Sequence, residues 1–421
     1  MFRFKEILII SVGFGIILFL LFSFLAPKLL GKATEKVALV GRFSTSELPY
    51  DILHLIGEGL TVLDPAGNPL PALAEKWETP DKGLTWIFTL KSGITWQDGS
   101  EVVANPAMYS FEDVEVNIID PKTISFKLKN AFAPFPTVVS KPTFKRGLLG
   151  TGAWSVKNVS LAGEFVERLE IGDREGNTKI YKFYPTEERS KLAFKLGEVD
   201  EILDVVDPRP FDKWDTVKLK EEVNQKRFVA VFFNTHDALL SDKKIRQALS
   251  YAIDKDQFVG SQRALGPIPP TSWAYNSQIK PYEFDKKRAI ELIGGQSLDI
   301  KLVTNPFLLD SAEMIAKNWE GVGVHTSVSV SSILPEDFQA FLVMYDTPSD
   351  PDQYSTWHST QFDTNITRYH NERVDSLLES GRSETDFETR KKMYLDFQRY
   401  LLEDAPAAFL YHPISYTIIR K

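Results

Sequence analysis

The order of apolar and polar positions changes within residues 228–254 from the pattern of a strand to that of a helix. The run from Phe228 to Phe232 is aromatic and β-branched, as expected for a strand buried in a core. Beyond Asn234, apolar residues recur at spacings of three and four, which places them on one face of a helix with Ser241 as its predicted N-cap. These helix positions are Ile245, Ala248, Leu249, Ala252 and Ile253. The pattern predicts a buried strand followed by an amphipathic helix in an α/β domain.

Alternating positions dominate an earlier part of the chain. Residues 84–90, 114–120 and 123–128 alternate between apolar and polar, and Asp98-Gly99 supplies a tight turn. A β-rich meander is therefore predicted here, preceded by a helix over residues 52–60.

In the second half of the chain, predicted strands alternate with predicted helices. Residues 298–303 read as a strand, residues 311–319 as a helix and residues 324–330 as a second strand. Such a β-α-β run favours a sheet covered by helices.

Two further helices carry local signals. Thr385 and Glu388 have the spacing of a capping box before a long helix that runs through Leu402. Residues 187–196 predict a shorter helix, whose inward positions are expected to be Leu192, Ala193 and Leu196.

Residues 7–26 are apolar apart from glycine and serine positions. About 20 such residues are enough to cross a bilayer as a helix. They predict a transmembrane anchor, with residues 1–6 in the cytoplasm and residues 27–36 as a spacer. A secretory signal cleaved near Ala33 is the alternative. In both cases the rest of the chain lies on the extracytoplasmic face of the cell membrane.

Composition narrows the function classes. A chain of 421 residues is too long for one ordinary core, so two or more lobes are expected. The net charge of −8, with no basic block beyond the N-terminal segment, argues against nucleic acid as a partner. Cysteine is absent, which excludes disulfides, thiolate metal sites and a cysteine nucleophile. Neither a His-x-x-x-His pair nor a Gly-x-Ser-x-Gly elbow occurs, so we predict no catalytic residue, metal or cofactor. Carboxylates are plentiful but unpaired by any motif, so we expect a protein that is not an enzyme, with a hydrolase as the least favoured alternative.

Two separated groups of motifs carry a family resemblance. The first is an ordered series of four short segments, and the second is the strand and helix over residues 228–254, with Phe232-Phe233-Asn234-Thr235 at their junction. The series consists of Glu58-Gly59-Leu60, Pro71-Ala72-Leu73-Ala74-Glu75-Lys76-Trp77, Trp86-Ile87-Phe88-Thr89-Leu90 and Trp96-Gln97-Asp98-Gly99. In this order the motifs resemble the family 5 extracellular solute-binding proteins, the peptide- and nickel-binding receptors of ABC importers such as oligopeptide- and dipeptide-binding proteins.

The resemblance implies an α/β fold of the periplasmic-binding-protein-like type II class. It would comprise two large mixed α/β lobes with a hinge near residues 225–230 and 400–408, and a reduced, β-rich small lobe. This second lobe looks abridged, because residues 101–106 run almost directly into the next strands. The expected division is lobe I at residues 37–55, 141–227 and 400–421, the small lobe at residues 56–140 and lobe III at residues 228–399.

The function implied by the resemblance is that of an extracytoplasmic receptor. It would bind a peptide or similar small solute between the lobes and deliver it to ABC permease subunits, as a monomer held at the membrane by its N-terminal helix. The chain lacks the cysteine that anchors lipoprotein receptors of the family. That absence and the abridged lobe leave an alternative, a membrane-tethered sensor or scaffold that kept the fold but not transport.

The resemblance also implies ligand-binding residues on two walls of the cleft. One wall would include Thr45, Ser46 and Glu47. On the other, the backbone near Tyr345 and Asp346 would hydrogen-bond an extended peptide, a mode of recognition that tolerates varied side chains.

A loop beyond this second wall brings in Trp357, either as a ligand contact or as a core residue. In many peptide receptors of the family an aspartate near this bend holds the ligand's α-amine, and the matching position here is Thr347. The neighbouring Asp350 and Asp352 fit turn formers better than ligand groups.

Overall fold

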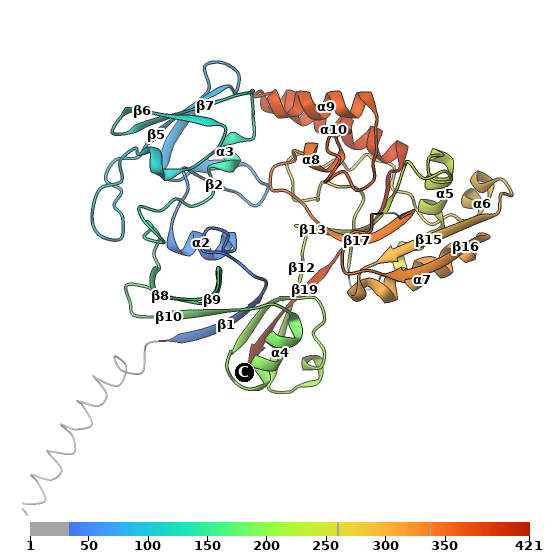
Figure 1. Ribbon diagram of the computed structural model, residues 1–421, viewed down its shortest axis with the longest axis horizontal. Coiled ribbons are helices and arrows are strands. Elements are labelled where there is room, and N and C mark those ends of the chain that lie inside the picture. Colours follow the sequence, from blue (N-terminus) through green and yellow to red (C-terminus); the bar gives the residue numbers. More distant parts are fainter. Residues whose placement is uncertain (1–32, 259–260, 337) are drawn as a thin grey trace, which may run out of the picture.

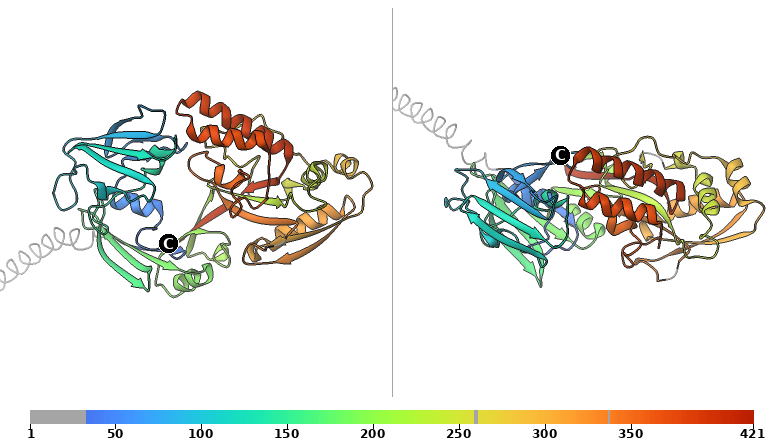
Figure 2. Two further views of the ribbon diagram at one scale, coloured as in Figure 1. Left: turned by 45° about the horizontal axis from the view of Figure 1, so that its top comes forward. Right: turned by 90° about the horizontal axis from the view of Figure 1, so that it is seen from above.

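Three large sheets and one short hairpin organise the chain into three lobes (Figure 1). The computed structural model describes residues 33–258, 261–336 and 338–421. We name each lobe after a strand of its sheet: the β1 lobe, the β5 lobe and the β13 lobe. In two further views the β5 lobe lies beside the two long C-terminal helices (Figure 2).

The β1 lobe contains a mixed sheet of seven strands in the order β12-β19-β11-β1-β10-β9-β8. Its first strand is parallel to β10 and β11. The strands are β1 (Thr34–Val40), β8 (Ser155–Ala162), β9 (Phe165–Gly172), β10 (Thr178–Tyr184), β11 (Glu201–Val205), β12 (Val217–Val223) and β19 (Ile414–Arg420). Val37 packs in the cluster with helix α2 (Tyr50–Ile56), whereas Ala38 packs with α4 (Glu187–Lys195) and the short helix η2 (Phe211–Lys213). Successive residues of β1 thus serve opposite faces of the sheet.

The β13 lobe contains six strands in the order β14-β18-β13-β17-β15-β16. They are β13 (Arg227–Phe233), β14 (Gln262–Arg263), β15 (Leu298–Thr304), β16 (Val324–Val330), β17 (Ala340–Asp346) and β18 (Ala407–His412). The helices are α5 (Lys243–Ala252), α6 (Lys286–Ile293), α7 (Leu309–Glu320), α8 (Tyr354–Trp357), α9 (Glu372–Ser383) and α10 (Phe387–Asp404), with short helices η3 (Lys255–Gln257) and η4 (Pro306–Leu308).

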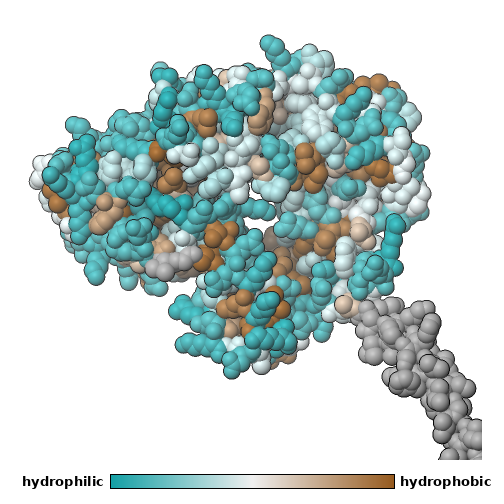
Figure 3. Space-filling view, turned by 180° about the vertical axis from the view of Figure 1, so that it is seen from behind, coloured by the Kyte–Doolittle hydropathy of each residue, from teal (hydrophilic) through white to brown (hydrophobic). Residues whose placement is uncertain are grey.

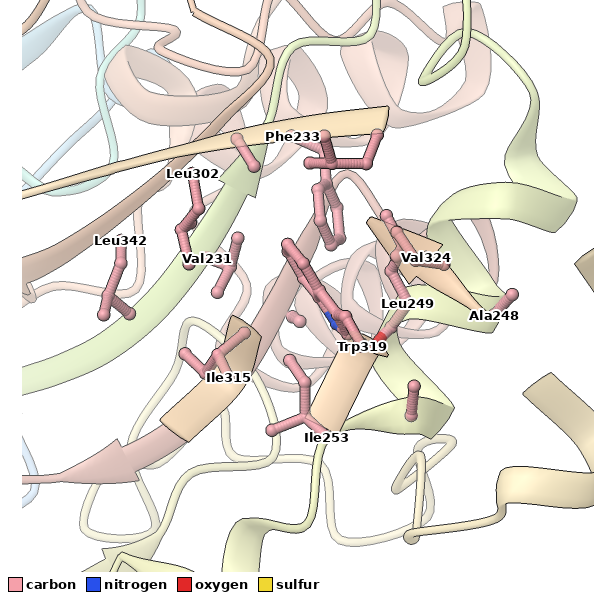
Figure 4. Packing of buried hydrophobic residues seen from close by; sticks show 14 of the residues in the cluster. Val231, Phe233, Ala248, Leu249, Ile253, Leu302, Ile315, Trp319, Val324 and Leu342 are labelled. Atoms are coloured by element: carbon pink, nitrogen blue, oxygen red, sulfur yellow. Dashed lines mark hydrogen bonds between the residues drawn. The ribbon is translucent and has the colours of Figure 1, made fainter. Parts of the chain in front are cut away.

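Strand β13 is buried on both faces, which explains its unbroken apolar run. Val231 and Phe233 pack in one cluster with Trp319 of α7 (Figure 4). Phe228 and Phe232 pack in a second cluster on the other face. The predicted strand and helix are confirmed.

The predicted cap of the helix is wrong by one residue. The side chain of Asp242 accepts a hydrogen bond from the Lys244 amide, whereas the Ser241 hydroxyl donates to the Ala238 carbonyl. A carboxylate at Asp242 supplies the stronger, charged acceptor at the helix start.

The β5 lobe contains a four-stranded antiparallel sheet in the order β4-β5-β7-β6 and the hairpin β2-β3. Its elements are β2 (Thr61–Leu63), β3 (Pro69–Pro71), β4 (Ala74–Glu78), β5 (Thr85–Leu90), η1 (Pro106–Met108), β6 (Val114–Asp120), β7 (Thr123–Leu128) and α3 (Phe135–Val138). The predicted β-rich meander is therefore present. Between Leu90 and Val114, where every backbone position is described, the only helical turn is η1.

Three helix predictions need correction. Helix α2 ends at Ile56 rather than Leu60, because Gly57 adopts an extended conformation. Helix α4 buries Ala193 and Phe194 and leaves Leu192 and Leu196 exposed. The aromatic Phe194 packs on Phe211, so it sets the inward face of this helix.

The predicted capping box also differs from the observed helix start. The cap of α10 is Asp386, whose carboxylate accepts from the Thr389 amide at 3.0 Å. Thr385 therefore lies one residue before the cap.

The predicted transmembrane segment, residues 7–26, lies outside the described residues. Across the described ranges no helix has both the length and the apolar character needed to span a bilayer.

The chain passes between the β1 and β13 sheets twice, and the two crossings lie side by side. Strand β12 leads through residues 224–226 into β13, and β18 leads through Pro413 into β19. Val223 pairs with Ile414, and the Asn224 amide donates to the Pro413 carbonyl at 2.8 Å. The second crossing is thus later than the predicted residues 400–408, which lie in α10 and β18.

His412 ties the two crossings together. Its Nδ1 lies 2.7 Å from the Arg227 carbonyl oxygen, so Nδ1 carries the proton in this contact. Burial lowers the pKa of His412 below its ordinary value of 6.5. The folded chain therefore holds a neutral ring in a place that resists its protonation.

We expect the stability of the protein to fall as the pH drops below 6.5, in part because of His412. In that range the unfolded chain binds a proton that the folded ring resists, so acid favours unfolding. His412→Asn keeps a donor for the Arg227 carbonyl and removes the titration. Urea unfolding at pH 7 and pH 5 should show a smaller loss of stability in the variant than in wild type. Equal losses would mean that His412 titrates freely, and the comparison cancels the similar effect of His54.

Candidate functional site

The predicted residues of the first wall lie in the exposed loop between β1 and α2. Thr45, Ser46 and Glu47 are all exposed. The Glu47 amide donates to the Ser44 carbonyl at 3.1 Å, and the Ser44 hydroxyl lies 3.0 Å from the Glu47 carboxylate. The loop thereby fixes the direction of that carboxylate.

A pocket of about 350 Å³ opens next to this loop. The β1 and β5 lobes supply almost all of its wall, and the β13 lobe adds one residue. The lining residues are Glu47, Leu48, Tyr50, Leu53, Leu63, Thr137, Val138, Ser140, Lys141 and Ser349. The volume is at the lower end of the range of small-molecule sites. Of the six predicted ligand-binding residues, Glu47 alone belongs to this lining.

The second predicted wall begins at the end of β17. Its residues Val343 to Asp346 pair with β13 on one side. On the other side, pairing with β15 stops at Leu342, and no other strand of the described chain continues it. Main-chain groups along this edge are therefore free to pair with an extended ligand.

The side chains of Tyr345 and Asp346 are engaged within the protein. The Tyr345 ring packs on Phe228 and Phe232, and its hydroxyl lies 3.1 Å from Thr356 Oγ1. Asp346 is 81% exposed, yet its carboxylate lies 2.7 Å from Arg227 Nε. These contacts leave the backbone of β17 as the part of this wall best placed for recognition.

Trp357 is fully buried. Its ring packs against Phe232 and Phe409, and its Nε1 donates to Gln353 Oε1 at 3.2 Å. These contacts are those of a core residue, which is one of the two roles predicted for Trp357. The other role, contact with a ligand, stays a prediction.

The bend after β17 is fixed by aspartate–arginine pairs. Asp350 accepts from both terminal nitrogens of Arg390 in a buried pair, and Asp352 lies 3.1 Å from Arg382 Nε. Both aspartates also accept from backbone amides two residues on, as turn formers do. Burial raises the pKa of Asp352, which Arg382 opposes. The hydroxyl of Thr347 is buried without a hydrogen-bond partner.

Contacts between the β5 and β13 lobes close the side of the cleft opposite the crossings. The Ala133 amide donates to the Arg382 carbonyl at 2.6 Å. The Arg382 guanidinium lies 5.0 Å from the Phe132 ring and 4.4 Å from the Tyr354 ring. The contacts of Arg382 with Phe132 and Ala133 join two lobes that share no sheet, whereas Tyr354 belongs to the β13 lobe itself.

A second contact lies at the tip of the β2-β3 hairpin. Gly67 has a φ of +87°, and a Cβ there would clash with the Ser349 carbonyl oxygen. The neighbouring Ala66 carbonyl accepts from the Trp273 amide at 3.3 Å. From behind, the lobes are seen to surround an opening through the molecule (Figure 3).

Sequence reasoning missed Lys141 and the three arginines that hold the cleft residues, Arg227, Arg382 and Arg390. Each arginine lies far along the chain from its aspartate, and no local motif marks such a pair. In the part of the chain that the structure describes, no group of three His, Cys, Asp or Glu side chains could hold a metal ion.

Paired crossings, a cleft and an open strand edge are features expected of a protein that binds a ligand between lobes. A profile of the bacterial extracellular solute-binding proteins, family 5 Middle, matches residues 68–118 and 106–366. The chain belongs to this family of solute-binding proteins, so it is an extracytoplasmic binding protein of the kind that serves ABC importers and not an enzyme.

Relatives of known role are distant but nearly complete in coverage. The oligopeptide-binding protein AppA of Bacillus subtilis is 22% identical, over 91% of this chain and 85% of its own length. The dipeptide-binding protein of Escherichia coli is 24% identical, over 84% of this chain and 82% of its own length.

Solved structures confirm the predicted fold class. NikZ from Campylobacter jejuni in complex with Ni(L-His) matches with a TM-score of 0.73 and 23% identity, over 92% of this chain and 94% of its own. The ABC transporter substrate-binding protein CtaP from Listeria monocytogenes matches with a TM-score of 0.75 and 18% identity, over 92% of this chain and 94% of its own. The fold is that of a type II periplasmic-binding protein.

We expect Arg382→Ala to loosen the contact between the β5 and β13 lobes. The change removes the cation–π contact with Phe132, which crosses between the two lobes. Within the β13 lobe it also removes the contact with Tyr354 and leaves the partly buried Asp352 without its nearest cation. If the closed state loses about 1 kcal/mol of stability relative to the open state, the ratio of closed to open molecules falls about fivefold. Because the chain has no cysteine, labels at Ile119→Cys and Ile290→Cys report the distance between the two lobes.

The control is Arg399→Ala, whose guanidinium pairs with Asp396 within α10. Double electron–electron resonance should show longer and broader distances in the Arg382 variant only. Identical distributions in wild type and both variants would contradict a role for Arg382 in closure.

Proposed function

We propose that this protein binds a peptide or a similar small solute in the cleft between its lobes and delivers it to an ABC permease. The observation that carries the proposal is the open edge of β17 from Val343 to Asp346. An extended peptide can add there as a strand, with its main chain pairing and its side chains free to vary. The pocket beside Glu47 is lined in part by Ser349, from the segment that follows β17.

Opening and closing would turn on the two adjacent crossings. Residues 224–226 and Pro413 connect the β1 and β13 lobes through a narrow pair of strands, the arrangement that a hinge needs. We further propose that residues 7–26 hold the protein at the membrane and that it works as a monomer. Two similar proteins support solute delivery: AppA is an oligopeptide-binding protein, and CtaP is an ABC transporter substrate-binding protein.

We expect peptides to raise the melting temperature of the purified full-length chain. A ligand that binds only the folded state adds about 2.7 kcal/mol of stability at a hundred times its Kd. A set of di- to pentapeptides, screened by thermal denaturation, should contain stabilising members, and native mass spectrometry should show them bound one to one.

Two matched variants locate the site. Val138 lines the pocket and Val103 does not, although both are 41% exposed. Val138→Trp should fill the pocket and abolish the stabilisation, whereas Val103→Trp should leave it intact. If no peptide stabilises wild type and none co-purifies, peptide binding is wrong. If peptides bind but cells lacking the protein take them up normally, the sensor or scaffold role replaces transport.

A further inference from the structure

Every carboxylate on the β17 wall of the cleft already has a cationic partner. Asp346 pairs with Arg227, Asp350 with Arg390 and Asp352 with Arg382. Thr347, between them, is neutral. A positively charged ligand group at this wall would have to displace an arginine that the protein itself supplies. The wall is therefore suited to main-chain pairing and not to holding an ammonium group.

The pocket across the cleft has the opposite character. It is lined by one carboxylate, Glu47, and one ammonium group, Lys141. Among the described residues, neither side chain has an oppositely charged partner within ion-pair distance. The Ser44 hydroxyl directs the Glu47 carboxylate, and the Tyr109 hydroxyl lies 3.0 Å from the Lys141 carbonyl, which fixes that backbone. The Glu47 carboxylate and the backbone of Lys141 are thus held in place, and neither charge is neutralised by an ion pair.

The surface between the two charges is mostly apolar. Leu48 and Leu53 are buried at its base, and Tyr50 and Val138 expose part of their side chains. Such a surface gains free energy by covering an apolar group. A complementary ligand thus has an apolar middle, a positive end and a negative end, within about 350 Å³.

We propose that this pocket binds a short zwitterionic peptide with an apolar side chain, its ammonium group at Glu47 and its carboxylate at Lys141. The inference rests on the proposed function and specifies its ligand. It assigns the ligand amine to the β1 lobe and the ligand carboxylate to the segment after α3. Charge-assisted hydrogen bonds at both ends would fix the direction of the peptide.

The test compares one dipeptide with its capped forms on the full-length chain. Isothermal titration would use Leu-Leu, N-acetyl-Leu-Leu and Leu-Leu amide with wild type, Glu47→Gln and Lys141→Gln. Each variant should weaken Leu-Leu binding about tenfold or more. Glu47→Gln should add no further loss for the acetylated peptide, and Lys141→Gln none for the amide, since each cap has already removed the partner charge.

Glu164→Gln and Lys127→Gln are matched controls, because both side chains are exposed and lie outside the pocket lining. They should bind Leu-Leu as wild type does. Because Glu47 and Lys141 are exposed as well, all four variants should fold normally, which melting temperatures would verify.

Several results would overturn the assignment. Equal affinity for Leu-Leu and both capped forms would exclude charge recognition of the ends, and unchanged binding in both variants would exclude these residues. If Glu47→Gln proved redundant with the amide cap instead, the peptide would lie in the reverse direction. If Leu-Leu failed to bind while other peptides stabilised the chain, the ligand class would be wrong and the proposed function would stand. If no peptide bound at all, the proposed function itself would fail.

Discussion

The two chain crossings, held against each other by hydrogen bonds, are the constraint on which the arrangement of the lobes depends. The Asn224 amide reaches the Pro413 carbonyl, and His412 reaches the Arg227 carbonyl. The apolar clusters stop on either side of this ribbon, so that each lobe has a core of its own. Among the described residues no apolar cluster spans the β1 and β13 lobes, and a connection this narrow is what allows rigid lobes to rotate.

Because the cores are separate, the relative positions of the lobes depend largely on a few polar contacts. Arg227 begins β13 at the crossing, and its guanidinium joins Asp204 of the β1 lobe at 2.8 Å to Asp346 of the β13 lobe at 2.7 Å. Asp204 has a φ of +54°, an unusual conformation for aspartate, at the point where it meets this arginine. On the other side of the opening, Arg382 joins the β5 and β13 lobes. The lobes are thus tied on both sides of the cleft.

Local signals explain which parts of the fold were predictable. Strand β13 and helix α5 follow from a change of period within one short stretch, and the β15-α7-β16 run follows from the same kind of pattern. Errors arose where two nearby residues were both of a type that suits the position. Asp242 replaced Ser241 as a cap, and Phe194 rather than Leu192 faced the core.

The second crossing was placed too early for a related reason. The end of α10, with Ala405 at positive φ, is followed at once by the apolar strand β18. The boundary between lobes then falls at Pro413, after that strand, where no break in the apolar pattern marks it.

The candidate site was predictable only in part, because its charges are paired over long sequence distances. Glu47 was predicted from its position relative to a family motif. In contrast, nothing in the local sequence shows that Asp346 pairs with Arg227, 119 residues away. The same holds for Asp350 and Arg390, which are 40 residues apart. Lys141 became a candidate only when the fold placed it beside the same pocket as Glu47. Which carboxylates are free for a ligand is a property of the folded chain.

The lobes contribute unequally to the lining of the pocket, and this bears on the order in which ligand binding and lobe closure occur. All of its lining except Ser349 comes from residues 47–141, on the side of the cleft that the β1 and β5 lobes form together. A ligand can therefore make its contacts with Glu47, Lys141 and the apolar base before the β13 lobe arrives. Closure would then add Ser349 and the free edge of β17, which recognises main chain and not side chains. In the proposed arrangement the first wall would select the ligand, and the second wall would retain whichever ligand the first has accepted.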